Sequence, residues 1–199
     1  MAMTNTPETA TIDDAELISR SLARAFDDDP MMRWFFPDAA TRAAELGRYF
    51  TTIFTRQYLG NGLCERTSGA AAFWVPTEAQ EKAVPDGDTI QELLGILGDR
   101  AGLFRDAVQT AIAHTPEEPH WSLALIGADP AVQGQGQGSA LLRSGLARAD
   151  AAGRPIYLES SKESNIPVYE HFGFTVRTTM ELPGGGPVLW GMWREARVG

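Results

Sequence analysis

The chain has 199 residues and a net charge of −9, from 17 lysines and arginines against 26 aspartates and glutamates. This length fits one domain and does not require two. No segment approaches the ~18 consecutive apolar residues of a membrane span, and the single cysteine, Cys64, excludes a disulfide framework and a cysteine-rich zinc site. The acidic balance argues against a nucleic-acid or anionic-membrane surface. We therefore expect a soluble, cytoplasmic, single-domain protein without a metal centre.

The first half of the chain predicts mostly helices. Residues 1–10 are polar and contain no apolar run, so we expect a flexible tail and not a signal peptide. Apolar residues at helical spacing then predict three helices, the last of them long or broken because of its glycines. They are expected at residues 13–26, 38–58 and 88–113. Two short strands are expected between the second and third helices, at 63–66 and 70–75.

The second half alternates strands with helices. Its strands are expected at residues 121–128, 155–159, 174–181 and 188–195. Its helices are expected at residues 139–152 and 167–172, and Asn165 is placed to cap the second of them. Strands that alternate with helices and end in a hairpin predict a mixed α/β sheet.

A glycine-rich turn joins the 121–128 strand to the helix that follows. Residues 133–139 read QGQGQGS. Glycines let backbone N–H groups point at an anion, and a helix N-terminus adds its partial positive charge. We therefore expect this turn to hold a phosphate-bearing ligand, and the simpler alternative is a flexible connector.

Three phosphate-binding patterns compete for this turn. A Walker A loop needs a lysine after its last glycine, and this turn has none. A Rossmann fingerprint fits the spacing of Gly134, Gly136 and Ser139, but roughly sixty residues then remain, too few for the rest of a dinucleotide-binding sheet. The pattern Gln-x-x-Gly-x-Gly is satisfied by Gln133, Gly136 and Gly138.

This last pattern resembles the acetyl-coenzyme A signature of the GNAT N-acetyltransferases, and further residues agree with that family in order and spacing. They are Leu125–Pro130, Leu158–Ser161, Asn165, Tyr169 and Phe172–Phe174. The resemblance covers about residues 119–180. It implies an α/β (α+β) fold with a mixed, mostly antiparallel sheet of about six to seven strands flanked by helices. Within the family, residues 159–176 are similar to puromycin-acetyltransferase-like members.

The resemblance also assigns parts of the chain to the two substrates. In a single GNAT domain, residues 11–118 would form the acceptor side, 119–180 the acetyl-CoA-binding core, and 181–199 the C-terminal strand. The residues implied in acetyl-CoA binding are Ile126, Ala128, Gln133, Gly134, Gly136, Gly138, Ser139 and Asn165. A backbone N–H near Ile126 to Ala128 would stabilise the oxyanion, and Asn165 would hold pantetheine or the loop.

Acetyl transfer to an amine needs a neutral amine, a stabilised oxyanion and a protonated leaving thiolate. Tyr169 matches the position of the family's usual acid tyrosine, so we expect its phenol to protonate the thiolate; the alternative is a core aromatic beside Phe172 and Phe174. For the general base there are two candidates, His120 and Glu159. His120 could simply begin a strand, and Glu159 could instead pair with an arginine or a helix end.

The acceptor is expected to be an amine. Residues 27–30 and 34–37 join the first two helices, and we expect them to border the acceptor pocket. Carboxylates beside exposed aromatics would suit a cation, and the alternative is helix punctuation with packed aromatics. The leading hypothesis is an acetyl-CoA-dependent N-acetyltransferase that uses direct attack on a small-molecule amine. The alternatives are a non-catalytic acyl-CoA-binding sensor on the same fold and a nucleotide-dependent oxidoreductase. GNAT proteins are often dimers, so a homodimer is expected.

Overall fold

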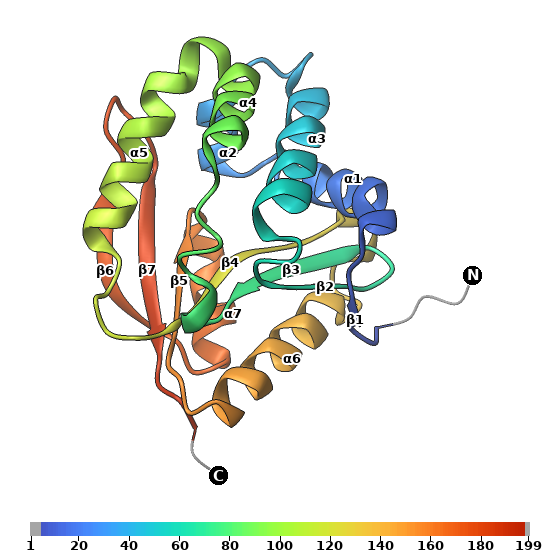
Figure 1. Cartoon of the computed structure of the whole chain (residues 1–199), viewed down its shortest axis with the longest axis vertical. Helices are drawn as coiled ribbons and strands as arrows, with labels where there is room; N and C mark the ends of the chain where they lie inside the picture. Colours follow the sequence, from blue (N-terminus) through green and yellow to red (C-terminus); the bar gives the residue numbers. More distant parts are fainter. Residues whose placement is uncertain (1–4, 198–199) are drawn as a thin grey trace.

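The computed structural model describes residues 5–197, which form a seven-stranded sheet flanked by helices (Figure 1). The strand order is β1-β2-β3-β4-β5-β7-β6, and every neighbouring pair is antiparallel except β4–β5. The strands are β1 (Glu8–Thr9), β2 (Leu63–Arg66), β3 (Ala70–Val75), β4 (Trp121–Ala128), β5 (Ile156–Ser160), β6 (Thr175–Glu181) and β7 (Val188–Arg194). The expected mixed, mostly antiparallel α/β fold is therefore confirmed.

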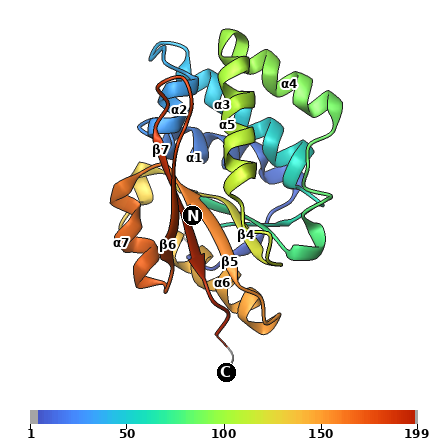
Figure 2. The same ribbon diagram turned by 90° about the vertical axis from the view of Figure 1, so that its left-hand side faces the viewer.

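Helices cover both faces of the sheet. The helices are α1 (Ala15–Ala25), α2 (Pro30–Phe35), α3 (Arg42–Thr52), α4 (Gly87–Leu97), α5 (Ala101–His114), α6 (Gln137–Ala151) and α7 (Ile166–His171). Figure 1 shows α6 on the opposite side of β2 and β3 from α1 and α3, and Figure 2 shows α5 and α7 on opposite sides of β5. Among residues 5–197, no helix has both the length and the apolar character needed to cross a bilayer.

Each face of the sheet has its own buried core. The core on the α1–α5 face includes Leu22, Phe50 and Phe73, and the core on the α6–α7 face includes Trp74 and Leu141. The second core is tightly packed, because a Cβ added to Gly145 of α6 would lie only 2.0 Å from the Trp74 ring. Burial of these side chains holds the two helical layers to the sheet.

The structure departs from the sequence-based expectation at the N-terminus. The flexible tail predicted for residues 1–10 is wrong for its described part, because β1 pairs with β2 and the Ala10 N–H donates to the Cys64 carbonyl. The Asn5 side chain also donates to the carbonyl of Gln135 in the glycine-rich turn, at 2.7 Å. Residues 1–4 of that prediction lie outside the described part of the chain.

The helix predicted for residues 38–58 changes its hydrogen bonding near its end. It is α-helical from Arg42 to Thr52 and π-helical from Ile53 to Tyr58, where the Leu59 N–H reaches the Phe54 carbonyl at 2.8 Å. Such π-helical turns are rare and occur often at functional sites. The short helix α2, which the sequence analysis did not predict, begins at Pro30 with Asp29 as its N-cap.

The parallel strands β4 and β5 separate after three paired residues each. Pairing joins Trp121–Leu123 to Ile156–Leu158, whereas β4 continues to Ala128 along β3. A β-bulge marks the point of separation, because Leu125 lies opposite Phe73 while Leu123 lies opposite Trp74, so Ala124 is the extra residue. The gap that opens beyond the bulge positions the candidate site.

Candidate active site

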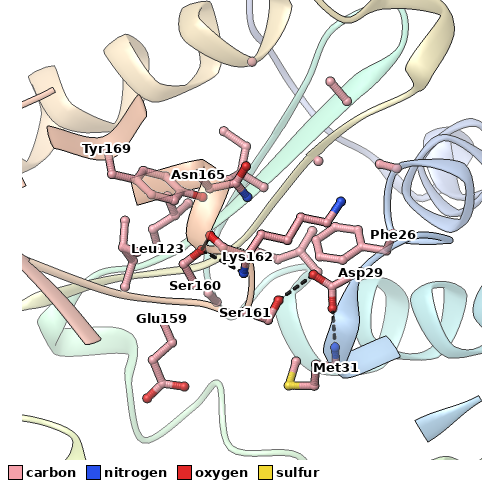
Figure 3. Close-up of a pocket in the computed structure, with 18 of the residues that line it drawn as sticks. Phe26, Asp29, Met31, Leu123, Glu159, Ser160, Ser161, Lys162, Asn165 and Tyr169 are labelled. Carbon is pink, nitrogen blue, oxygen red and sulfur yellow. Dashed lines mark hydrogen bonds between the residues drawn. The ribbon is translucent and has the colours of Figure 1, made fainter. Parts of the chain in front are cut away.

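A cavity of about 820 Å³ lies where β4 and β5 separate. Its lining includes Phe26 and Leu189 from the core on the α1–α5 face, and Leu142 and Tyr169 from the core on the α6–α7 face. The cavity therefore passes from one face of the sheet to the other. Figure 3 shows part of this lining, with Asn165 and Tyr169 at one end and Glu159 at the other.

The glycine-rich turn supplies the wall at the N-terminus of α6. Gly134 and Gly136 have φ values of 75° and 84°, the left-handed region that favours glycine. The first helical hydrogen bond runs from the Ala140 N–H to the Gly136 carbonyl, which leaves the N–H groups of residues 137–139 at the open end of the helix. The first turn carries no acidic side chain. This end of the helix is therefore suited to bind a phosphate.

Two glutamines hold the turn in place. The Gln133 side chain donates to the Ala128 carbonyl at 3.1 Å. Gln137 is buried, and its side-chain oxygen accepts hydrogen bonds from the Thr67 hydroxyl and the Gly69 N–H at 2.7 and 2.9 Å. The sequence analysis missed Gln137, because its partners lie almost 70 residues away on the β2–β3 turn.

The backbone of β4 beyond the bulge directs polar groups into the gap. In an antiparallel ladder, every second residue turns its N–H and C=O toward the partner strand, and the residues between turn them away. The Asp129 N–H donates to the Gly69 carbonyl and so points toward β3, as the N–H groups two and four residues earlier do. Ile126 and Ala128 therefore turn their N–H groups away from β3, and both residues line the cavity. Their N–H groups can therefore serve as donors to a ligand between the strands.

Tyr169 extends from α7 into the α6–α7 side of the cavity (Figure 3). It is 9% exposed and lies in edge contact with Phe174, at 6.0 Å between ring centroids. Burial, aided by the negative charge of Asp29, raises the pKa of its phenol to about 12. The phenol therefore stays protonated at neutral pH, as a proton donor must.

Asn165 precedes α7 but does not cap it with its side chain. No hydrogen bond joins its side chain to the first turn of α7, so the sequence-based expectation of a side-chain cap is wrong. Asn165 lines the cavity beside Tyr169. Its amide is consequently available to a ligand on this side of the sheet.

Glu159 lies on the opposite face of β5 from Leu158 and points away from Tyr169 (Figure 3). The hydroxyl of Tyr157, two residues earlier on the same face, donates to its carboxylate at 3.1 Å. Burial raises the pKa of Glu159, opposed by this hydrogen bond and by the charge of His114. The carboxylate thus binds a proton more tightly than an exposed glutamate does.

His120 lies outside the described lining of the cavity. Its ring is 3% exposed and packs between Tyr157 and Trp193, with each pair of ring centroids at 5.7 Å. Its Nδ1 lies 2.7 Å from the Glu118 carbonyl, and its Nε2 is buried without a partner among the described residues. The structure therefore brings Glu159, and not His120, together with the other candidate residues.

The junction between α1 and α2 contributes the Asp29 carboxylate and the Phe26 ring to the cavity, but none of the aromatic rings of residues 34–36. Asp29 lines the cavity, whereas Phe35 and Phe36 are buried in the core and Trp34 packs beside Gly186, so the expectation of exposed aromatics at the site is wrong. Both oxygens of the Asp29 carboxylate are used locally. One accepts from the first N–H groups of α2 and the other from the Ser161 hydroxyl.

Neighbouring residues extend this connection across the mouth of the cavity. Lys162, next to Ser161, forms an ion pair with Asp28. The hydrogen bond from Lys162 lowers the pKa of Asp28. The loop after β5 is thereby attached to the loop before α2.

The cavity has further lining residues that the sequence analysis did not single out. From the helical first half they include Ile53, Gln57, Tyr58, Val108, Ala111 and Ile112. Cys64 is buried behind them, and burial raises the pKa of its thiol to about 12, which argues against a nucleophilic thiolate.

Comparison with known sequences finds a family match for the central part of the chain. Residues 88–174 match the model of the acetyltransferase (GNAT) family. An uncharacterized N-acetyltransferase of Schizosaccharomyces pombe is 38% identical over 66 residues, which are 33% of this chain and 27% of that protein. The match to this curated relative thus spans little more than a quarter of its length.

Solved structures agree with this assignment over nearly the whole chain. A Corynebacterium glutamicum protein described as histone acetyltransferase HPA2 and related acetyltransferase is 26% identical and has a TM-score of 0.74, covering 98% of this chain and 97% of its own. An N-acetyltransferase from Staphylococcus aureus Mu50 shares the fold at 14% identity and a TM-score of 0.61, covering 94% and 99%. The chain therefore has the fold of these acetyltransferases, and its residues 88–174 carry the match to the GNAT acetyltransferase family.

Proposed function

We propose that the protein is an acetyl-CoA-dependent N-acetyltransferase that acts on a small-molecule amine by direct attack in a ternary complex. One observation carries this proposal. The cavity crosses the sheet between β4 and β5, with a helix end suited to phosphate on one face and a half-buried carboxylate on the other. Such a passage lets two substrates meet from opposite faces.

Acetyl-CoA would occupy the face of α6 and α7. Its pyrophosphate would accept hydrogen bonds from the N–H groups of residues 137–139 and of the turn that contains Gly134 and Gly136. Its pantetheine arm would lie in the gap between β4 and β5, held by the Asn165 amide. The thioester carbonyl would then lie near the N–H groups of Ile126 and Ala128, which would stabilise the oxyanion.

The reaction forms one C–N bond and breaks one C–S bond. The lone pair of the neutral amine attacks the thioester carbon, and the carbonyl electrons move onto the oxyanion. When the oxyanion collapses, the thiolate departs and Tyr169 donates its proton to the sulfur. Before attack, the Glu159 carboxylate takes one proton from the bound ammonium, directly or through water, which gives the neutral amine. The second proton, which the nitrogen loses after attack, returns through water to the Tyr169 phenolate.

Glu159 is a better candidate for the general base than His120. The Glu159 carboxylate faces the cavity on the side opposite Tyr169, where an incoming amine would approach. Its raised pKa brings its proton affinity closer to that of the amine, which is the direction a general base requires. His120 is enclosed by Tyr157 and Trp193.

Two measurements test this function. Acetyl-CoA at a hundredfold excess over its dissociation constant should stabilise the protein by about 2.7 kcal/mol in thermal unfolding, whereas NAD should not. A panel of primary amines should then release free CoA thiol. Stabilisation by acetyl-CoA without thiol release for any amine would favour the non-catalytic sensor, and equal stabilisation by NAD would favour the oxidoreductase.

We further propose that the protein is a cytoplasmic homodimer. The support for a dimer is that GNAT proteins often form dimers. Light scattering at micromolar concentration should give twice the 21.6 kDa mass of one chain. A mass of one chain would contradict the dimer without affecting the proposed chemistry.

A further inference from the structure

The part of the cavity on the α1–α5 face has a chemical composition that selects among amines. This inference rests on the proposed function. Among the described residues, three charged side chains line the cavity, namely Asp29, Lys162 and Glu159. Asp29 is bonded to α2 and Ser161, and Lys162 is paired with Asp28. Glu159 is therefore the carboxylate left for a ligand.

The helix α5 forms an apolar wall of this chamber. Val108, Ala111 and Ile112 line the cavity from α5. Val108 is 38% exposed and Ile112 is 61% exposed, and their spacing of four residues puts both on the same face of α5. Within α5 only Ala107 is buried. Val108, Ala111 and Ile112 therefore face an open chamber, whereas Phe104 and Ala107 of the same helix pack in the core.

The π-helical turn Ile53–Tyr58 forms another wall. Ile53 and Tyr58 line the cavity together with Leu189 of β7. Tyr58 and Glu159 line the same cavity, and burial raises the pKa of the Tyr58 phenol. The turn thus presents an aromatic ring and an aliphatic side chain beside the point where an ammonium would bind.

We propose that the acceptor is a primary amine with one positive charge and an apolar body. Its ammonium group would pair with Glu159, and its apolar body would lie between α5 and the π-helical turn. A second ammonium group on the body would prevent apolar contact with Val108 and Ile112 and would find no further free carboxylate among the lining residues. A carboxylate beside the amine would be repelled by Glu159.

Two matched pairs of amines test the proposal. Hexylamine and 1,6-diaminohexane have the same length but differ by one charge, and 2-phenylethylamine and phenylalanine differ by one carboxylate. Initial rates of CoA release should give kcat/KM at least tenfold higher for hexylamine and for 2-phenylethylamine than for their partners. Equal or reversed preference in either pair would overturn the proposal.

A pair of variants tests the position of the apolar body. Ile112→Asn should raise KM for hexylamine about tenfold and leave KM for acetyl-CoA unchanged. Ile90→Asn is the control, because Ile90 is a 39% exposed isoleucine on α4 outside the cavity lining. An Ile112→Asn protein with the parent KM for hexylamine would contradict the assigned wall.

The results also separate this inference from the function on which it rests. If acetyl-CoA binds but none of the four amines releases thiol, the proposed transferase activity itself is contradicted. If the diamine or the amino acid is acetylated as fast as its partner, the transferase activity stands and the apolar selectivity is wrong.

Discussion

At the scale of single residues, Tyr169 and Glu159 project from opposite faces of the sheet into one cavity. Burial raises the pKa of both, to about 12 for Tyr169. The same physical cause suits two different roles. A phenol with a raised pKa keeps its proton at neutral pH and would give it up as charge develops on the departing sulfur, and a carboxylate with a raised pKa accepts a proton more readily.

Replacing Tyr169 by phenylalanine removes the proton donor and retains the ring. The turnover number should fall by about 10²–10⁴, the usual contribution of a positioned general acid. KM for acetyl-CoA should change little, because the loss is confined to the transition state. Steady-state kinetics with a known acceptor measure both values, and turnover within threefold of the parent would remove Tyr169 from the mechanism.

Protonation of Glu159 should cause the fall of kcat/KM at low pH, the acid limb of the pH profile. Its carboxylate must be ionised to accept a proton, so kcat/KM should fall as pH drops through its raised pKa, above the ordinary value of about 4.5. Two groups oppose this rise in pKa, Tyr157 on β5 through its hydrogen bond and His114 on α5 through its charge. Glu159→Gln should lower kcat/KM by about 10²-fold or more and abolish this limb. An unchanged limb in the variant would assign it to another group.

The same substitution should have the opposite effect on stability. When the pKa of a carboxyl group is higher in the folded state than in the unfolded state, the free energy of unfolding falls as pH rises from the lower of these pKa values to the higher. Each unit of that difference corresponds to about 1.4 kcal/mol. Glu159→Gln should therefore unfold at a higher temperature than the parent at neutral pH, and the difference should vanish below about pH 4. Thermal unfolding at the two pH values checks this, and a variant less stable at neutral pH would contradict the buried, costly charge.

At the scale of elements, the strands were the most predictable part of the chain. The bounds expected for β2, β3 and β4 are those observed, because turn-forming residues flank short apolar runs. The helix α2 was not predicted, because it has only six residues. It begins at Pro30, directly after three aspartates, and such a sequence is more typical of the end of a helix. The π-helical turn has no sequence signature that separates it from the α-helix before it.

The two ends of α6 offer a matched test of the phosphate site. Gly136 and Gly153 both have a positive φ, at 84° and 62°, and alanine at either position should cost roughly 1 kcal/mol of stability. Only Gly136 adjoins the helix end that would hold the pyrophosphate. Calorimetry should therefore show at least tenfold weaker acetyl-CoA binding for Gly136→Ala and near-parent binding for Gly153→Ala. Equal losses in the two variants would contradict the position of the phosphate.

At the scale of the whole molecule, the candidate site joins segments that are far apart in the sequence. The glycine-rich turn, Asn165 and Tyr169 could be predicted, because they follow one another at regular spacing on consecutive elements. The wall formed by Tyr58 and Ile112 could not, because it depends on how α3 and α5 pack over the separated strands. A local sequence pattern thus predicts the proposed acetyl-CoA side of the cavity, whereas tertiary packing determines the proposed amine side.

The two sides are also joined physically across the mouth of the cavity. The bonds from Ser161 to Asp29 and from Lys162 to Asp28 link the loop after β5 to the loop before α2. The Asp29 carboxylate caps α2 and contributes to the raised pKa of Tyr169. The loop that leads to Tyr169 is thus attached to the start of α2.

Direct transfer between two substrates that meet in this cavity is the central claim, and mass spectrometry of one reaction mixture tests it. The mixture contains the protein, acetyl-CoA and hexylamine. N-acetylhexylamine should form in an amount equal to the CoA released, and the protein should keep its unmodified mass throughout. CoA release without acetylated amine, or a protein that gains an acetyl group which the amine then removes, would contradict direct attack.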